Sequence, residues 1–195
     1  LDEKAQALAL EQERLSKNSQ RLQELENLIA AKEASMKNLK ETLSRALNSF
    51  EGKGLTVEQK NGKVYVSMEN KLLFNSGSYA VGAEGKKAVI EVGKVLGDNP
   101  EISVLIEGHT DNDAFTAAGP IADNWDLSTK RATAIVAILS ENKSINKQNL
   151  TAAGRSEYSP LVSNATADGK AKNRRIEIIL TPRLDEISKM LNDIN

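Results

Sequence analysis

The chain has no cysteine and a single histidine, and both scarcities limit the chemistry open to it. Without cysteine, a disulfide framework and thiol catalysis are excluded. A Ser-His-Asp or related relay would have to centre on His109. The acids Asp111, Asp113 and Asp123 could join it around a divalent ion, but no paired-histidine spacing supports that ligand set. We therefore expect no metal and no other cofactor.

Aromatic residues and unbalanced charge are also scarce. Aromatic residues make up 4% of the chain, so the core of any domain must be aliphatic. The 26 basic and 27 acidic residues leave a net charge of −1, and the two signs are mixed along the chain. A nucleic-acid partner, which usually requires a basic excess, is not expected.

Long apolar runs are missing as well. No stretch is long and apolar enough to predict a membrane-spanning helix, and no signal peptide is recognisable. The sequence begins at Leu1, inside a helical pattern, rather than with methionine. We interpret it as part of a longer protein whose targeting or membrane segment lies upstream.

Two familiar enzyme signatures are not matched. Gly77, Gly82 and Gly85 fit neither common spacing of a phosphate-binding loop. The segment from Gly154 to Tyr158 resembles a Gly-x-Ser-x-Gly nucleophile elbow, but it lacks the second glycine and Pro160 follows where a helix should begin. Its serine, Ser156, is interpreted as a loop residue.

The sequence starts instead with a long helical pattern. Residues 1–47 contain no glycine or proline and are rich in good helix formers. Aliphatic residues recur every seven positions, as in the a seam of a coiled coil: Leu8, Leu15, Leu22, Ile29, Met36 and Leu43. The matching d seam is interrupted by Glu11, Asn18 and Lys32. Residues 1–50 are assigned to a helical stalk. A weakly self-associating coil is favoured over a single helix resting on the domain, because so polar a helix is poorly stable alone.

A β-hairpin is predicted next, over residues 51–70. Gly52 and Gly54 mark the boundary with the stalk, and apolar residues alternate on both sides of Asn61-Gly62. This dipeptide is the strongest short hairpin signal, because a type I′ turn needs positive φ at both positions. Residues 72–74 then read as a short buried strand.

Strands and helices alternate through the rest of the chain. The apolar periods predict helices over 83–97 and 127–140, strands over 102–108, 150–154 and 175–180, and a final helix over 184–195. This order predicts an α+β fold, an α/β sandwich with helices packed on a mixed sheet. Residues 71–183 are assigned to one domain.

Two charged residues are placed where a ligand site would be expected. Asp111 follows the strand that runs into Gly108, at the edge where open sheets present ligands. Arg131 lies in the opening turns of the next helix, whose first amides also favour a carboxylate. Opposite charges in one cleft suit a zwitterion. The alternative is that Arg131 pairs with an acid on its own helix and Asp111 caps a turn.

Five motifs occur in a characteristic order between Lys71 and Pro182. They are Phe74-Asn-Ser-Gly-Ser78, Val104-Leu-Ile-Glu-Gly-His-Thr-Asp111, Asn124-x-x-Leu127-Ser128-x-x-Arg131-Ala132, Gly154-x-Ser-x-Tyr-x-Pro160 and Asn173-Arg-Arg-Ile-Glu177. This set resembles the OmpA-like C-terminal domain family, which includes OmpA, Pal and MotB. The resemblance implies a βαβαβ core with a mixed sheet and non-covalent binding of the peptide stem of peptidoglycan.

The resemblance also implies roles for individual residues. Asp111 would take the amine of meso-diaminopimelate, Arg131 its carboxylate, and Asn124 would add a hydrogen bond. The full set of expected ligand-binding residues is Asp111, Arg131, Asn124, Thr110, Asn75 and Leu127. Two departures from the family pattern stand out: the loop over 112–123 is longer than usual, and Asn75 stands where many members carry an acid.

The expected function is a non-enzymatic cell-wall anchor. It would be periplasmic, attached to the outer membrane of a Gram-negative bacterium through the upstream segment, with peptidoglycan as partner and a weak homodimer through the stalk. Three alternatives remain open: a MotB-like stator or secretion-system anchor of the inner membrane, a coiled-coil scaffold, and a wall hydrolase.

Overall fold

The computed structural model describes residues 2–75, 78–115 and 120–183. Two compact units divide the chain, and the second, Met36–Pro182, contains the whole sheet and the helices around it. The first unit contains the described residues 2–35, which form part of a single helix. In the described part of the chain, no helix is both long and apolar enough to cross a membrane.

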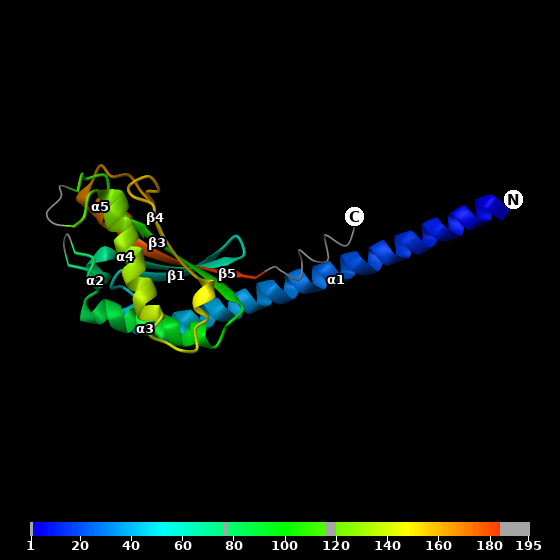
Figure 1. The fold of residues 1–195 in the computed structure, drawn as a ribbon, viewed down its shortest axis with the longest axis horizontal. Coiled ribbons are helices and arrows are strands. Elements are labelled where there is room, and N and C mark those ends of the chain that lie inside the picture. Colours follow the sequence, from blue (N-terminus) through cyan, green and yellow to red (C-terminus); the bar gives the residue numbers. More distant parts are fainter. Residues whose placement is uncertain (1, 76–77, 116–119, 184–195) are drawn as a thin grey trace. The chain divides into compact units, whose positions relative to one another are not determined.

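Five strands of the second unit form one mixed sheet in the order β1-β2-β5-β3-β4 (Figure 1). The strands are β1 (Leu55–Lys60), β2 (Lys63–Glu69), β3 (Ile102–His109), β4 (Leu150–Gly154) and β5 (Arg175–Pro182). Among the paired neighbours of this sheet only β3 and β4 are parallel, while β5 lies between β2 and β3 and is antiparallel to both. The predicted α+β class with a mixed sheet is confirmed.

The helices follow the predicted alternation with the strands. They are α1 (Asp2–Ala46), α2 (Asn70–Leu73), α3 (Ala83–Gly97), α4 (Asn124–Leu139) and α5 (Ala167–Asn173), with short 3-10 turns at Asn48–Phe50 and Lys147–Asn149. The predicted helix over 184–195 lies outside the described residues.

The predicted hairpin is confirmed, and it belongs to the main sheet. Asn61 and Gly62 have φ of 52° and 71°, the positive values that a type I′ turn requires. β2 pairs with β1 on one side and with β5 on the other. The hairpin is therefore the outer part of the sheet rather than a lead-in that precedes it.

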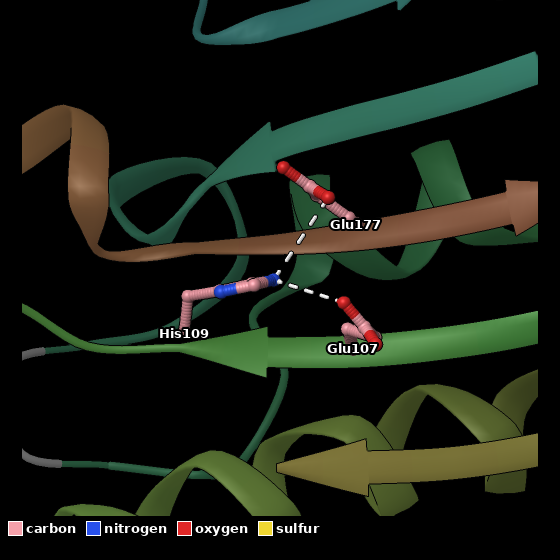
Figure 2. A group of neighbouring side chains, drawn as sticks. All are labelled: Glu107, His109 and Glu177. Carbon is pink, nitrogen blue, oxygen red and sulfur yellow. Dashed lines mark ion pairs between the residues drawn. The ribbon is translucent and has the colours of Figure 1, made fainter. Parts of the chain in front are cut away.

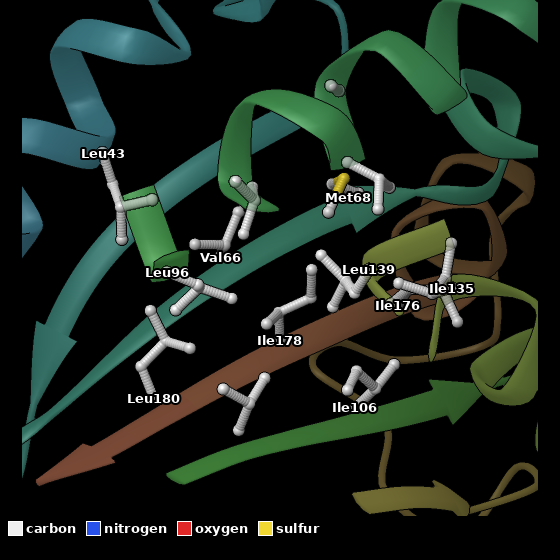
Figure 3. Close-up of a cluster of buried hydrophobic side chains, with 14 of the residues drawn as sticks. Leu43, Val66, Met68, Leu96, Ile106, Ile135, Leu139, Ile176, Ile178 and Leu180 are labelled. Carbon is white, nitrogen blue, oxygen red and sulfur yellow. The ribbon is translucent and has the colours of Figure 1, made fainter. Parts of the chain in front are cut away.

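The aliphatic core lies on one face of this sheet (Figure 3). Alternate residues of the strands point into it, such as Val66 of β2, Ile106 of β3 and Ile178 of β5, all completely buried. Helices α3 and α4 cover them through residues such as Leu96 and Leu139. This alternation is the period-two pattern of a half-buried sheet.

The last turns of α1 contribute to the same core. Met36, Leu39 and Leu43 are at most 2% exposed, and Leu47, just after the helix, is buried with them. The seven-residue seam is therefore divided, because its last two members pack inside the second unit and are not available to a coiled coil. The compact unit begins at Met36, within the helix, and not at the glycines near residue 50.

The prediction of a strand over residues 72–74 is wrong. Residues 70–73 form the helical turn α2, closed by a hydrogen bond of 2.8 Å from the Phe74 amide to the Asn70 carbonyl. Helix α3 packs closely on this turn, because a Cβ at Gly85 would lie 2.8 Å from the Leu73 Cα. A three-residue apolar run carries no period that separates the two structures.

We predict that Leu43 stabilises the globular unit as an ordinary core residue. Leu43→Ala should lower the free energy of unfolding by about 2–5 kcal/mol, because it opens a cavity in a packed core. Leu22→Ala, at a seam position that is 61% exposed, should change it by less than about 0.5 kcal/mol. Urea denaturation of both variants checks this. If both variants lowered the free energy of unfolding equally, Leu43 would not differ from Leu22 in packing inside the globular unit.

Candidate functional site

A pocket of about 630 Å³ opens beyond the carboxyl end of β3. This volume is within the usual range for small-molecule sites. Its lining comes from α2, α4, α5 and the loops around them: Glu69, Asn70, Lys71, Phe74, Asn75, Asp111, Asp113, Ala114, Phe115, Asn124, Leu127, Arg131, Ala171 and Arg174. Five of the six residues expected from the sequence to bind a ligand are among them.

Two glycines set the distance between α4 and the sheet. A Cβ at Gly108 would overlap the Ser128 carbonyl group, and one at Gly154 would overlap the Thr129 hydroxyl. Only glycine therefore lets α4 pack directly on β3 and β4. This close approach brings Arg131 on α4 to the end of β3, where Asp111 follows.

Arg131 is the most unusual residue of the pocket, since it is charged and only 3% exposed. Its Nε donates to the Ser78 carbonyl oxygen at 2.9 Å, and its guanidinium lies 5.1 Å from the centre of the Phe74 ring. Among the described residues it forms no ion pair within 4 Å. Burial, and then the neighbouring Arg174, lower the pKa of Arg131 to about 10, while Asp111 opposes the shift. The guanidinium therefore remains charged at neutral pH.

Asp111 is also buried, and it already has a cationic partner. One carboxylate oxygen accepts a hydrogen bond from the Arg174 guanidinium, and the other accepts the Asp113 amide at 3.1 Å. Asp111 therefore does cap a turn, as the alternative interpretation predicted, but it also pairs with Arg174. Asp111 and Arg131 line one pocket without pairing with each other, so both charges face the same space.

Asn124 connects the pocket to a neighbouring loop. Its amide donates to the Asp113 carbonyl at 2.9 Å and to the Glu157 carboxylate at 3.2 Å. Asp113 itself pairs with Lys170 of α5. The part of the long 112–123 loop that the structure describes therefore contributes to the pocket wall through Asp113 and its two neighbours in the lining, Ala114 and Phe115.

The start of α4 is less open to a ligand than the sequence suggested. Asp123 caps the helix, accepting the Asp126 amide at 2.8 Å with its side chain, and its carbonyl accepts the Leu127 amide at 2.9 Å. Both amides are therefore already satisfied, that of Asp126 by the capping side chain and that of Leu127 by the first backbone bond of the helix. Arg131 is left as the main group for an anion in this wall.

The other expected residues lie at different depths. Leu127 is a buried apolar part of the lining, whereas Asn75 lines the pocket from an exposed position. Thr110 is buried but does not line the pocket. Its amide donates to Ser156 and its hydroxyl to the Asp111 carbonyl. Thr110 supports the backbone that carries Asp111.

Among the described lining residues that the sequence did not predict as ligand-binding, two contact the charged residues Asp111 and Arg131 through their side chains. Arg174 belongs to the Asn173-Arg-Arg motif, which was identified without a role for it, and it pairs with Asp111. Phe74 lies under the Arg131 guanidinium. Arg174 lies just before β5, and the start of β5 pairs with the end of β3, after which Asp111 follows. The sequence shows the position of Arg174 before a strand, but only the order of the strands in the sheet shows that it is close to Asp111.

His109 lies away from the acids that were considered with it. The residue is 2% exposed and its Nε2 lies 3.7 Å from Glu107 and 3.9 Å from Glu177, which face each other across β3 and β5 (Figure 2). Neither ring nitrogen has a hydrogen-bond partner in the part of the chain that the structure describes. These three side chains have the composition of a metal site.

Two arginines already compensate the carboxylates of this group. Arg175 donates to Glu177 at 2.7 Å, and Arg155 lies 3.8 Å from Glu107. A divalent ion would add positive charge to a group that is balanced while the imidazole is neutral. Burial, followed by the charges of Arg175 and Arg155, lowers the pKa of His109 to about 3. We interpret His109 as a buried neutral imidazole.

We predict that His109 makes the fold less stable in mild acid. Its folded-state pKa lies below the ordinary value of 6.5, so the unfolded chain binds the additional proton as the pH falls. From pH 7 to pH 5 this should reduce the free energy of unfolding by about 2 kcal/mol. Because His109 is the only histidine, His109→Gln should remove most of that dependence. Urea denaturation at the two pH values tests this, and an unchanged dependence would contradict it.

Known proteins share both the sequence and the fold of this region. The chain is 34% identical to Motility protein B of Bacillus subtilis (strain 168) over 118 residues, which cover 60% of this chain and 45% of that protein. It is 30% identical to Probable lipoprotein YiaD of Escherichia coli (strain K12) over 135 residues, covering 69% and 59%. The chain thus spans about half the length of these curated relatives.

A solved structure resembles most of the chain. The cell wall anchor of the T6SS from Pseudomonas aeruginosa superposes with a TM-score of 0.64 at 30% identity, covering 72% of this chain and 97% of that one. The family model described as the OmpA family matches residues 73–174, more than half of the chain, and this range includes Asp111 and Arg131. The chain belongs to the OmpA family.

Proposed function

We propose that the pocket binds the stem peptide of peptidoglycan through the side chain of meso-diaminopimelate, and that the protein anchors a larger structure to the cell wall. The observation that carries this proposal is the burial of Arg131 without an ionic partner among the described residues. This buried cation lies in a pocket wide enough for a peptide side chain. A buried charge is costly unless it is paired, so an anionic ligand would complete this site.

Asp111 makes the site suitable for a zwitterion rather than for a simple anion. The end of the diaminopimelate side chain carries an ammonium and a carboxylate on one carbon. Arg131 would hold the carboxylate in a forked pair of hydrogen bonds, and Asp111 would accept the ammonium. Arg174, which is 38% exposed, can share Asp111 or turn towards the same carboxylate.

The charges of the pocket support binding rather than hydrolysis. Each of its acids already pairs with a cation: Glu69 with Lys71, Asp111 with Arg174, and Asp113 with Lys170. The described lining contains no serine, threonine, histidine or cysteine. A wall hydrolase would need an acid and base pair or a nucleophile in contact with the substrate.

We further propose a periplasmic location, with the outer membrane as the structure that is tethered. The similarity to a protein named as a lipoprotein supports this assignment. The similarity to Motility protein B and to the T6SS cell wall anchor supports the alternative, a MotB-like stator or a secretion-system anchor of the inner membrane. Membrane fractionation of the full-length protein distinguishes the two.

A second proposal concerns weak self-association through residues 2–35. Leu8, Leu15, Leu22 and Ile29 repeat at seven-residue intervals and are 47–62% exposed. Regularly spaced aliphatic residues on a polar helix are typical of a coiled-coil seam, and the polar d positions would keep the association weak. The dimer would therefore depend on four a positions.

The change that tests this dimer is Leu15→Glu with Leu22→Glu. We expect the intact chain to show a sedimentation mass that rises with concentration, and the double variant to remain a monomer, because charges enter the seam. Gln12→Glu with Gln20→Glu adds the same charge outside the seam and should leave association unchanged. An intact chain that stays monomeric at every concentration would disprove the dimer.

For the pocket itself, Asp111→Ala and Arg131→Ala should each remove most of the affinity for purified cell-wall sacculi. Each leaves one end of the zwitterion unpaired in a desolvated pocket, at a cost of about 2–5 kcal/mol. Arg131→Lys should be nearly as damaging, because an ammonium cannot form the forked pair. Co-sedimentation with sacculi measures the effect.

Matched charge changes outside the pocket serve as controls for these variants. Lys130→Ala removes the cation next to Arg131, and Asp168→Ala removes an acid whose side chain is 80% exposed. Both should pellet with sacculi as the parent does, and circular dichroism should show that all variants are folded. Folded Asp111→Ala and Arg131→Ala proteins that still pellet normally would show that the proposed site is wrong.

A further inference from the structure

We propose that Trp125 and Tyr158 form a binding platform for the glycan strand, beside the pocket that holds the stem peptide. The inference rests on the proposed function, and it extends the bound part of peptidoglycan from the stem peptide to the sugar. Trp125 and Tyr158 stack on each other with ring centres 5.6 Å apart and planes 28° apart. The platform is the surface that this pair of rings presents to solvent.

Both rings are unusually exposed for large aromatic side chains. Trp125, the only tryptophan of the chain, is 50% exposed, and Tyr158 is 70% exposed. Single exposed apolar residues are common and need no explanation. Two aromatic rings that stack outside the core hold each other in place, and the ring surface that they leave exposed gains by covering an apolar face of a ligand.

The platform is continuous with the pocket. Trp125 directly follows Asn124, which lines the pocket, and Tyr158 directly follows Glu157, which accepts a hydrogen bond from Asn124 at 3.2 Å. One asparagine therefore joins the pocket wall to both chain segments that carry the rings.

The loop that carries Tyr158 is hydrogen-bonded to β3, to the residue that follows it and to α4. The Arg155 amide donates to the Gly108 carbonyl at 2.9 Å. Ser156 is buried, accepts the Thr110 amide at 2.9 Å and donates its own amide to the Ser128 hydroxyl at 3.2 Å. Its φ is +51°, an uncommon conformation for a serine that the surrounding bonds maintain. The ring of Tyr158 is thus presented on a preorganised backbone, which reduces the entropy lost on binding.

The chemistry of peptidoglycan attaches a sugar close to diaminopimelate. The stem peptide is joined through a lactyl group to N-acetylmuramic acid, and diaminopimelate is its third residue. Two residues and the lactyl link span roughly 10 Å when extended. A pyranose ring has one face of C–H groups that can cover an aromatic ring, while its hydroxyl and acetamido groups remain in water.

The test compares two soluble ligands by isothermal titration calorimetry. One is the tripeptide L-Ala-γ-D-Glu-meso-diaminopimelate, and the other is the same peptide carrying the N-acetylglucosaminyl-N-acetylmuramoyl disaccharide. The parent protein should bind the disaccharide peptide roughly fivefold more tightly, which corresponds to about 1 kcal/mol. Trp125→Ala and Tyr158→Ala should lose this gain and keep the affinity for the bare tripeptide.

Three further variants show whether stacking causes the gain. Trp125→Phe and Tyr158→Phe keep an aromatic ring and should retain most of it. Leu161→Ala, at an apolar residue of the same loop that is 58% exposed, should retain it fully. Equal affinity of the parent for both ligands, or a gain that survives both alanine variants, would overturn the glycan platform while leaving the peptide site intact. No binding of either ligand would overturn the proposed function together with the platform.

Discussion

The close approach of α4 to the sheet is the constraint on which the rest of the site depends. Gly108 and Gly154 leave no side chain between the strands and the helix, and any Cβ there would overlap Ser128 or Thr129. Because α4 lies so close, Arg131 reaches the end of β3 and becomes buried. The same helix presents Asn124 to the pocket and Trp125 to solvent.

Burial of Arg131 then determines what the pocket can accept. A guanidinium that is 3% exposed, with one carbonyl and one aromatic ring as its described contacts, remains positive at neutral pH. The same lining contains the Asp111 carboxylate, which pairs with Arg174. His109 lies outside this pocket lining, in a balanced group with Glu107 and Glu177, and so supports the sheet rather than the ligand site.

Apolar periodicity predicted the sheet, the hairpin and the helices α3 and α4, because each buries one face over many residues. It failed for α2, whose apolar run is too short to show a period, and for α5, whose sequence Ala-Asp-Gly-Lys-Ala-Lys-Asn has no apolar face. Asp111 and Arg131 could be located from a strand end and a helix start. Arg174 could not, since it lies 63 residues from Asp111 and meets it only through the pairing of β3 with β5.

In the proposed site, Arg131 recognises the carboxylate at the end of the diaminopimelate side chain. A thermodynamic cycle tests it directly, using calorimetry with two tripeptides that differ only in carrying diaminopimelate or lysine, which lacks that carboxylate. The parent protein should bind the lysine peptide at least about tenfold more weakly, a difference of about 1.4 kcal/mol. Arg131→Ala should bind the two peptides equally. If the variant discriminates between them as strongly as the parent does, Arg131 is not the group that reads the carboxylate.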